Sequence, residues 1–336
     1  MKLFDKDLET EVVYVAEIGV NHEGGLDYAK DLLKSAAQSG ADAVKFQGYT
    51  PERYASASNV ERLARVSKFA LSAEQYAELV ALAKELNVHI FSTPLTEDWV
   101  DILDPTSDVF KIASGDITFE AVIRAAAKTQ KPVIISTGVA TLEEIDQAVA
   151  WVKDEIGDAA LKDRLVIMQC ICAYPAPLDQ ANVRGVPFLQ ERYGVYVGYS
   201  NHIVEAEACY AAIALGAPVI EVHFTDKKTG RDFHDHALSF EPEELKQLIA
   251  VGNRIKASLG SYDKIIQPCE LDPQLVRKGV VAANDLTDGH VLSRDDLMFA
   301  RPATEILSGD VLKLVGKKIG HAYKKGEQIK KSELNG

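Results

Sequence analysis

Long apolar stretches are absent from this sequence of 336 residues. No run comes near the ~20 apolar residues that a transmembrane helix needs, and the opening residues, MKLFDKDLE, are too charged for a signal peptide. We therefore expect no membrane span and a cytoplasmic location. With 47% hydrophobic and 26% charged residues, the composition is typical of a globular protein with one large and one small domain.

Paired cysteines and excess positive charge are absent as well. The four cysteines include no Cys-x-x-Cys pair, and their number suits a reducing compartment better than a disulfide framework. Cys170 and Cys172 are expected in a half-buried strand. The net charge of -13 argues against nucleic acid and anionic membranes as partners. Binding of an anionic small molecule would therefore need a few positively charged side chains at the binding site, because the protein as a whole is negatively charged.

What the sequence does contain is a repeated alternation of short β-branched runs with stretches of helical spacing. Eight such units in about 260 residues predict a TIM (β/α)8 barrel, since a doubly wound sheet more often stops at five or six strands. The expected strands are residues 12–19, 43–47, 88–93, 109–114, 132–137, 165–172, 194–199 and 218–224. The expected helices are residues 28–39, 73–86, 97–103, 119–129, 142–156, 204–215 and 242–259, with a looser segment up to about residue 192.

Polar side chains stand at the ends of all eight expected strands. Barrel active sites are assembled from the carboxyl ends of the strands, so polar residues on every strand predict one shared cup. These residues are Glu17, Lys45, Gln47, Thr93, Lys111, Ser114, Ser136, Thr137, Tyr174, Ser200, His202, His223 and Thr225.

Two of these side chains, Lys45 and Lys111, would bring positive charge into a cup lined by hydroxyl groups. Either lysine alone could equally be a solvated cation just past a strand. Together with several hydroxyls they predict a cradle for a phosphate and a carboxylate, because lysine supplies a point charge and hydroxyls supply short hydrogen bonds. The hydroxyls belong to Thr93, Ser114, Ser136 and Ser200.

His202 and His223 follow two consecutive expected strands, whose ends would lie about 5 Å apart. Two imidazoles at that separation can bind one metal ion, although each could also simply form a hydrogen bond at its strand end. Imidazole alone would suit Zn, Fe or Co, but coordination positions left to oxygen ligands would also admit Mn2+ or Mg2+.

The pattern changes beyond residue 259. Residues 261–278 have no clean period, and Pro268 and Pro273 interrupt them. A diverged repeat follows, GHVLSRDDL at 289–297 and GEQIKKSEL at 326–334, in which a turn glycine leads through an apolar strand to a serine that can cap a short helix. We therefore expect a barrel domain at 1–262, a linker at 263–278 and a small domain at 279–336. A domain of fewer than about 60 residues has only a marginal core, so the small domain should dock onto another surface.

Taken in order, several sequence blocks resemble the sialic acid synthase family. The resemblance runs from about residue 15 to the C-terminus, and its last part is similar to the family's antifreeze-like, β-clip type domain. It implies condensation of phosphoenolpyruvate with an N-acetylated aldose to give a nine-carbon 2-keto-3-deoxy acid and phosphate. The blocks are AEIGVNHEG (16–24), ADAVKFQ (41–47), FSTP (91–94), KIASG (111–115), STG (136–138), YP (174–175), GYSNH (198–202) and EVHFT (221–225).

The resemblance also implies a role for each matching residue. The metal ligands would be His202 and His223, with Mn2+ expected and Mg2+ or Co2+ as alternatives. Phosphoenolpyruvate would contact Lys45, Thr93, Lys111, Ser114, Ser136 and Ser200. The sugar would contact Gln47, Asp116, Tyr174 and Asp235, while Glu17 matches a carboxylate near the reacting groups. The implied catalytic set is Glu17, Lys45, Lys111, Asp116 and Tyr174.

The family resemblance further implies a homodimer in which the small domain caps the partner's barrel. Arg301, in the pair Arg301-Pro302, would then reach the sugar of the partner subunit. The following Ala-Thr-Glu lacks the family's usual glycines, so the loop could be shaped differently. A solvated arginine on an exposed loop is the alternative.

Departures from the family pattern concentrate on the acceptor side. Asp116 stands where the family usually has Glu, Cys172 where Asn or Ser is common, and Asn201 where Asp is common. The donor site looks intact, whereas the acceptor stays open between N-acetylmannosamine, its 6-phosphate and the precursors of legionaminic or pseudaminic acid. Basic residues at 53, 62, 65 and 68 do not form a recognisable phosphate motif.

Two other classes of function fit parts of the sequence. A Schiff-base aldolase would also place a lysine at a barrel strand end, and Lys45 or Lys111 could serve if its pKa were lowered. A non-catalytic carbohydrate-binding or ice-binding protein is suggested by the C-terminal domain. The eight polar strand ends argue against it, because a flat binding face needs no charged cup.

Overall fold

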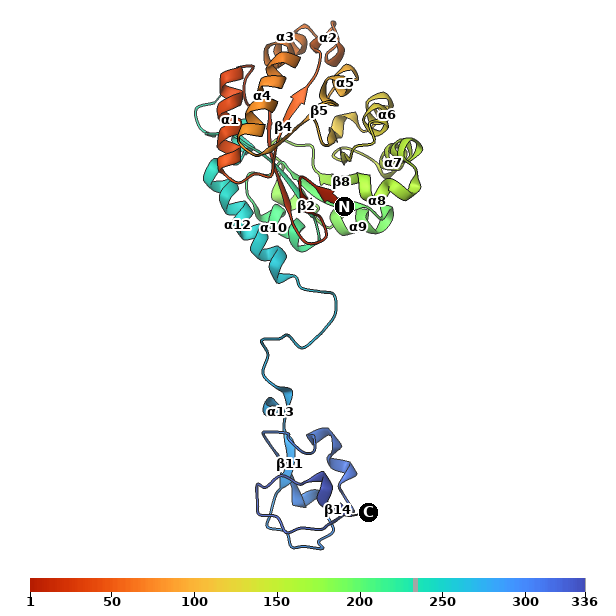
Figure 1. The fold of residues 1–336 in the computed structure, drawn as a ribbon, viewed down its shortest axis with the longest axis vertical. Helices are drawn as coiled ribbons and strands as arrows, with labels where there is room; N and C mark the ends of the chain where they lie inside the picture. The colour runs from red at the N-terminus through yellow and green to blue at the C-terminus, as the bar shows by residue number, and fades with distance from the viewer. Residues whose placement is uncertain (232–234, 336) are drawn as a thin grey trace. The chain divides into compact units, whose positions relative to one another are not determined.

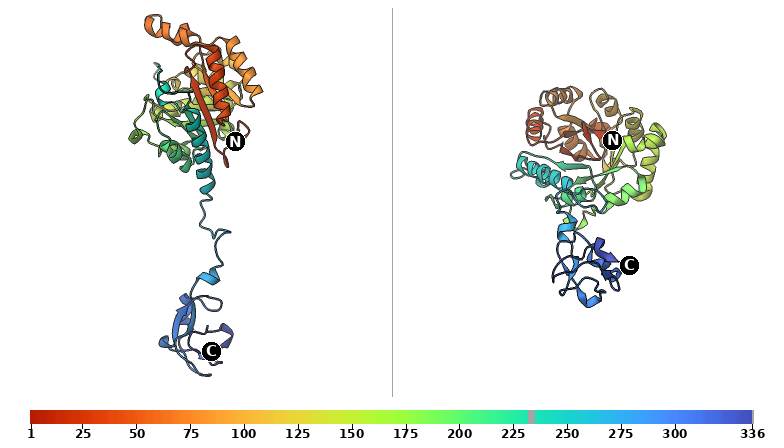
Figure 2. Two further views of the ribbon diagram at one scale, coloured as in Figure 1. Left: turned by 90° about the vertical axis from the view of Figure 1, so that its left-hand side faces the viewer. Right: turned by 60° about the horizontal axis from the view of Figure 1, so that its bottom comes forward.

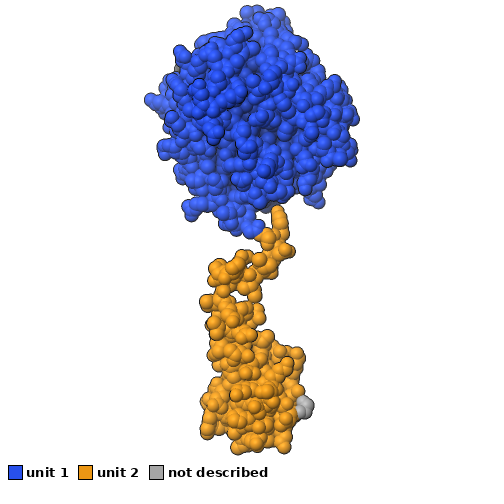
Figure 3. Space-filling model, viewed as in Figure 1, with its two compact units in different colours: residues 1–260 blue, residues 261–336 orange. Residues whose placement is uncertain are grey.

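The computed structural model describes residues 1–231 and 235–335. The chain divides into two units, residues 1–260 and 261–336, each with its own internal contacts (Figure 3). None of the described helices is both long enough and apolar enough to cross a bilayer.

Eight parallel strands form the centre of the first unit (Figure 1). Hydrogen bonding runs continuously in the order β5-β4-β3-β10-β9-β8-β7-β6, and contacts between β5 and β6 bring the two ends of the sheet together as a barrel. The predicted TIM barrel is confirmed. Its strands are β3 (Val13–Gly19), β4 (Ala43–Gly48), β5 (His89–Pro94), β6 (Phe110–Ile112), β7 (Val133–Ser136), β8 (Leu165–Cys170), β9 (Tyr196–Asn201) and β10 (Val219–His223).

Helices surround this sheet, as two further views show (Figure 2). Their apolar faces pack against the outward side of the strands, for example through Leu32 and Leu79. Local sequence sets where they begin: Ser72 and Thr141 each form a capping box with the residue three positions on. The surrounding helices are α1 (Leu26–Gln38), α4 (Ala73–Glu85), α5 (Asp98–Leu103), α6 (Glu120–Lys128), α7 (Leu142–Ile156), α9 (Gly185–Tyr193), α10 (Glu207–Ala214) and α12 (Pro242–Ser258).

Shorter helices occupy the connections. Two of them, α2 (Pro51–Tyr54) and α3 (Val60–Phe69), lie between β4 and α4, where the sequence predicted only a polar segment. α9 likewise forms where we expected looser structure. The remaining short helices of this unit are α8 (Leu161–Arg164), α11 (Asp235–Leu238) and the 3-10 turns η1 (Ser114–Asp116), η2 (Asp158–Ala160) and η3 (Leu178–Gln180).

An N-terminal hairpin that the sequence did not predict fills the amino end of the barrel. Strands β1 (Lys2–Leu3) and β2 (Lys6–Asp7) pair antiparallel around Phe4 and Asp5, whose φ values are 49° and 64°. Leu3, Phe4 and Leu8 are buried against inward side chains near the start of the strands. Those side chains are Val13, Val15, Ala43, Phe91, Val109, Ile134, Val166, Met168 and Val219.

The predicted sixth strand, residues 165–172, is two residues too long. β8 ends at Cys170, which is buried, and Cys172 is exposed in the loop that follows. The expected half-buried strand is therefore correct for Cys170 and wrong for Cys172.

The second unit has a small core of its own around Val280, Leu292 and Ile319. The two copies of the sequence repeat adopt matching conformations. Gly289 and Gly326 both have positive φ, of 83° and 90°, and in each copy a 3-10 turn then leads into a strand. The residues between glycine and serine form isolated bridges, at Val291 and Gln328, instead of the expected strands. The elements are α13 (Pro273–Val276), β11 (Gly279–Ala282), η4 (Arg294–Asp296), β12 (Leu297–Ala300), η5 (Ser308–Lys313), β13 (Lys318–Ile319), η6 (Lys331–Glu333) and β14 (Leu334–Asn335).

Candidate active site

A cavity of about 530 Å3 opens at the carboxyl ends of the barrel strands. The barrel residues to which the family resemblance gave a role all line it, although they come from many strands and from the loops that follow them. They are Glu17, Lys45, Gln47, Thr93, Lys111, Ser114, Asp116, Ser136, Tyr174, Ser200, His202, His223 and Asp235. Thr137 and Thr225 are buried near the strand ends but do not line the cavity.

Strand register brings the charged side chains to one level. Glu17 on β3 is paired in register with Lys45 on β4 and with His223 on β10. Side chains that are paired across neighbouring parallel strands point to the same face, here the barrel interior. This register places the three side chains next to one another, with Lys45 in direct contact with Glu17.

Four buried charges form a connected network on the inner wall of the cavity. Lys45 Nζ lies 2.6 Å from Glu17 Oε2 and 3.9 Å from Glu221 Oε2. Lys111 Nζ donates to both carboxylate oxygens of Glu221, at 2.8 and 3.0 Å. Ser200 Oγ also donates to Glu221, at 3.0 Å. Each buried cation therefore has a carboxylate partner, which offsets the cost of removing the charges from water.

Burial and pairing shift the pKa values of these groups in different directions. Burial raises the pKa of Glu17 to about 7, although Lys45 opposes the shift. Burial would also raise the pKa of Glu221, but Lys111 and Lys45 outweigh it and lower that pKa to about 2. Burial lowers the pKa of Lys111 despite the nearby Glu221. Glu17 is consequently the carboxyl of this network that can exchange a proton near neutral pH.

The hydroxyl groups expected to bind an anion lie around the two lysines. Lys45 Nζ donates to Thr93 Oγ1 at 3.1 Å. Ser114 Oγ accepts from the Gly138 backbone N–H at 3.0 Å, and the Ser114 hydroxyl also interacts with the Cys170 thiol. Ser136 Oγ is buried and has no hydrogen-bond partner among the described residues. A buried, unpartnered hydroxyl in a cavity wall is well suited to a polar ligand.

The two histidines predicted to bind metal lie side by side at the ends of the neighbouring strands β9 and β10. The centroids of the His202 and His223 rings are 5.2 Å apart. His202 Nδ1 donates to the carbonyl oxygen of Ile171 at 2.6 Å, so its Nε2 keeps a free lone pair. Burial lowers the pKa of both imidazoles. In the charge network, Lys111 adds to this shift and Glu221 opposes it.

These histidines fit a divalent metal ion. Both would be neutral near pH 7, as ligands must be, and His223 Nδ1 is buried without a hydrogen-bond partner among the described residues. No cluster of three or more histidine, cysteine, aspartate or glutamate side chains suited to a metal occurs in the described part of the chain. An ion held here by two imidazoles would retain positions for substrate oxygen and water.

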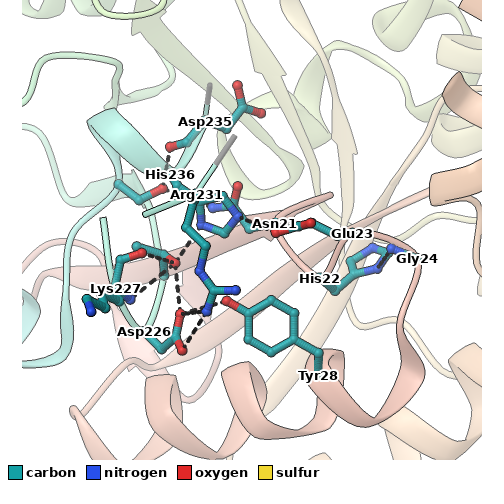
Figure 4. Close-up of polar contacts among 12 residues, drawn as sticks. Asn21, His22, Glu23, Gly24, Tyr28, Asp226, Lys227, Arg231, Asp235 and His236 are labelled. Carbon is teal, nitrogen blue, oxygen red and sulfur yellow. Dashed lines mark hydrogen bonds and ion pairs between the residues drawn. The ribbon is translucent and has the colours of Figure 1, made fainter. Parts of the chain in front are cut away.

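A separate polar network fixes Asp235, which lines the cavity from the start of α11 (Figure 4). The neighbouring His236 is fully buried and contacts Thr225 Oγ1 at 2.7 Å and Glu23 Oε1 at 3.2 Å. Ser239 Oγ donates to the Asp235 carbonyl oxygen at 2.6 Å. The segment with Asp235 and His236 is therefore not a solvated loop, because these contacts tie α11 to the end of β10 and to the β3–α1 loop.

Comparison with known proteins identifies the family. Residues 32–264 match the NeuB family and residues 277–335 match the SAF domain. The chain belongs to the NeuB family. The predicted resemblance to sialic acid synthases is thereby confirmed, and the chain is an enzyme of that family.

Relatives of this NeuB-family enzyme cover nearly its whole length. The N,N'-diacetyllegionaminic acid synthase of Campylobacter jejuni is 34% identical over 95% of this chain and 99% of that protein. The human N-acetylneuraminate-9-phosphate synthase is 31% identical over 91% and 88%, respectively. Among solved structures, the sialic acid synthetase of Leptospira borgpetersenii, in complex with citrate, is 30% identical with a TM-score of 0.72 and covers 77% of this chain and 88% of that one. The spore coat polysaccharide biosynthesis protein SpsE of Bacillus subtilis is 27% identical with a TM-score of 0.66, over 97% and 95%.

Several cavity residues of the NeuB-family enzyme were missed at the level of sequence. Glu221 lies in the middle of the buried β10, and a carboxylate inside the apolar run Val219-Ile-Glu-Val was the available signal. Arg62 and Arg65 on α3 also line the cavity, but the sequence did not reveal that their segment folds back over the site. Cys170 lines it as well, with Sγ 3.8 Å from His202 Nδ1.

The structure also shows where Asn201, Cys172 and Arg301 lie. Asn201 is buried and its Nδ2 donates to the Ile203 carbonyl oxygen at 2.7 Å, so it stabilises the turn that carries His202. Cys172 lines the cavity. Arg301 is exposed in the second unit, and its contact with a partner's sugar stays a prediction.

Proposed function

We propose that this NeuB-family enzyme condenses phosphoenolpyruvate with an N-acetylated aldose, giving a sialic-acid-like nonulosonic acid and inorganic phosphate. One observation carries the proposal: two buried lysines, several hydroxyls and a pair of neutral imidazoles line a single cavity at the mouth of the barrel. This set combines an anion cradle with a site for a divalent ion, as joining an enol phosphate to an aldehyde requires.

The donor substrate binds at the inner wall. Lys45 and Lys111 supply positive charge to the phosphate and carboxylate of phosphoenolpyruvate, and hydroxyl groups complete the contacts. The unpartnered Ser136 Oγ is directly available, and the Ser114 hydroxyl is a second proposed contact. The other proposed contacts are Thr93 and Ser200.

His202 and His223 hold the divalent ion, for which we propose Mn2+, with Mg2+ or Co2+ as alternatives. When bound, the ion supplies Lewis-acid polarisation of the aldehyde oxygen. Gln47, Asp116, Tyr174 and Asp235 orient the sugar so that its aldehyde carbon faces C3 of phosphoenolpyruvate.

Bond formation between these carbons leaves cationic character at C2 of phosphoenolpyruvate. Water adds there and gives up a proton, which Glu17 Oε accepts, because its pKa of about 7 allows it to gain and lose a proton under working conditions. The tetrahedral hemiketal phosphate then collapses by C–O cleavage and releases inorganic phosphate. Bond formation left the aldehyde oxygen as an alkoxide, and Glu17 passes the proton from water to that oxygen, which becomes the new hydroxyl of the sugar chain. The proton of the hemiketal hydroxyl leaves with the phosphate as the keto group forms.

Phosphate release tests this proposal directly. Metal-free enzyme is mixed with phosphoenolpyruvate and a panel of N-acetylated aldoses, with and without Mn2+, and inorganic phosphate is followed over time. We expect release only with both a sugar and the ion. His202→Ala and His223→Ala should each abolish turnover and Mn2+ binding while circular dichroism remains that of the wild type, because both residues lie at the mouth and not in the core. No phosphate with any sugar would reject the proposed function.

A Schiff-base aldolase remains a rival, since burial lowers the pKa of Lys111. The two contacts of its ammonium with Glu221 oppose this role, because they stabilise the charged form that cannot act as a nucleophile. Borohydride trapping with a keto acid substrate separates the two: an adduct on Lys45 or Lys111 would favour the aldolase.

A further inference from the structure

The connection between β4 and α4 contains four basic residues, and the structure separates their roles. Arg53 is neutralised, with Nη2 2.9 Å from Glu97 and Nη1 3.3 Å from Asp98. Lys68 does not line the cavity. Arg62 and Arg65 do line it.

The helix that carries these two arginines is fixed against the barrel. Val66 of α3 is buried in a cluster with Tyr49 and Leu95, and Tyr49 Oη donates to the Val66 carbonyl oxygen at 3.1 Å. At Gly24 a Cβ would lie 2.1 Å from the Lys68 carbonyl oxygen, so the end of α3 touches the β3–α1 loop at a position that accepts only glycine. The helix therefore has a defined orientation over the cavity.

The arginines stand three positions apart, and side chains with this spacing share one face of a helix. The Arg62 guanidinium carbon lies 5.4 Å from the centroid of the Tyr54 ring, and that ring lies 4.9 Å from the ring of Tyr49. The aromatic pair supports Arg62 from one side while its remaining donors stay accessible.

The charge balance of the cavity is uneven. Lys45 and Lys111 at the inner wall are each paired with a buried carboxylate. Neither Arg62 nor Arg65 forms an ion pair within the described residues, and both are exposed at the mouth. An anion arriving there meets two cations that no carboxylate of the described chain neutralises.

Substrate geometry indicates which anion this would be. Under the proposed function, the aldehyde end of the sugar must lie beside phosphoenolpyruvate and the histidines, so the far end of the open-chain sugar points to the mouth. We infer that Arg62 and Arg65 bind a phosphate monoester at that far end, which makes a phosphorylated N-acetylated aldose the acceptor. Guanidinium groups suit a phosphate monoester because they can donate two hydrogen bonds to phosphate oxygens.

The test compares N-acetylmannosamine with its 6-phosphate as acceptor for the full-length enzyme with Mn2+. We expect kcat/KM to be about 100-fold higher for the phosphorylated sugar. Arg62→Gln and Arg65→Gln should each lower kcat/KM for that sugar by about 10- to 100-fold, as the loss of a charge-assisted hydrogen bond implies. Their effect on the neutral sugar and on the KM for phosphoenolpyruvate should be much smaller. Arg53→Gln is the matched control, and its preference for the phosphorylated sugar should equal that of the wild type.

Several outcomes would overturn the inference. Equal use of the two sugars by the wild type would do so, as would a preference that survives the double substitution. A raised KM for phosphoenolpyruvate alone would assign the arginines to the donor. The affinity of the sugar phosphate for the wild type and the double variant is also measured by calorimetry, so equal affinities would refute the inference even if neither sugar is turned over. Absence of turnover with both sugars, by contrast, counts against the proposed function.

Discussion

Asp116 is half-buried on η1 at the wall of the cavity, and burial raises its pKa to about 6. The folded protein thus binds this proton more tightly than the unfolded chain does. The resulting contribution to stability is complete below about pH 4 and is lost as the pH rises to about 6. Above that pH the ionised carboxylate opposes folding, by roughly 1–3 kcal/mol. We interpret this cost as that of keeping a hydrogen-bond acceptor ready for the sugar.

Replacing this carboxyl should therefore stabilise the protein and impair its activity. For Asp116→Asn we expect the free energy of unfolding at pH 7.5 to rise by roughly 1–3 kcal/mol, and the advantage to shrink towards pH 4. Urea unfolding at pH 5 and pH 7.5 measures both effects, and the KM for the sugar should rise. Asp263→Asn, at an exposed position, is the control and should change nothing. A variant that is less stable at pH 7.5 would contradict this interpretation.

The functional residues could be predicted from the sequence where a polar side chain directly follows an apolar strand. Lys45, Lys111 and the histidines could be identified because a polar residue after an apolar run is conspicuous. Glu221 could not be assigned in the same way, since a buried carboxylate depends on cations from other strands, here Lys111 on β6 and Lys45 on β4. Pairing across the barrel is a property of the fold that a linear pattern does not contain.

Among the secondary-structure elements, the N-terminal hairpin contributes to the core although the sequence did not predict it. The eight strands were predictable because apolar β-branched runs are long and regularly spaced. The hairpin gave no such signal: its strands have two residues each, and its turn places Phe4 and Asp5 at positive φ, where Asn-Gly would be the recognisable pair. α3 was missed for a related reason, because Val66 is its only buried residue.

Loss of the hairpin's apolar contacts should destabilise the barrel without touching the active site. Leu8 is 2% exposed, so Leu8→Ala should lower the free energy of unfolding by about 2–5 kcal/mol. Leu259→Ala, at a position that is 40% exposed, should change it by less than about 0.5 kcal/mol. Urea unfolding followed by circular dichroism measures both. Equal stability of the two variants would show that the hairpin is not part of the barrel core.

At the scale of the whole molecule, the second unit has features of a domain that packs against another surface. Its core is small, and the segment before it exposes Tyr262, Ile266 and Leu271. We propose that the enzyme is a homodimer in which this unit covers the barrel of the partner subunit and Arg301 contacts the partner's sugar. Such a cover would also exclude bulk water from the reaction.

Mixing two inactive variants tests this arrangement. Arg301→Ala and His202→Ala subunits are combined under conditions that allow exchange. A mixed dimer contains one barrel with its own histidine and an intact partner arginine, so activity should return to about a quarter of that of the wild type in a random mixture. Each variant incubated alone is the control. If mixing restores nothing, Arg301 acts within its own chain or does not contact the sugar.

The hairpin at the amino end of the barrel also affects how the chain can fold during synthesis. Leu3, Phe4 and Leu8 are made before the barrel strands, yet one of the side chains that cover them, Val219, belongs to the last strand of the barrel. At about 5–20 residues per second, a ribosome needs roughly 10–40 s to reach that strand. Throughout this time the start of the chain lacks its full cover, so a chaperone that protects nascent apolar segments would hold this end of the enzyme longest.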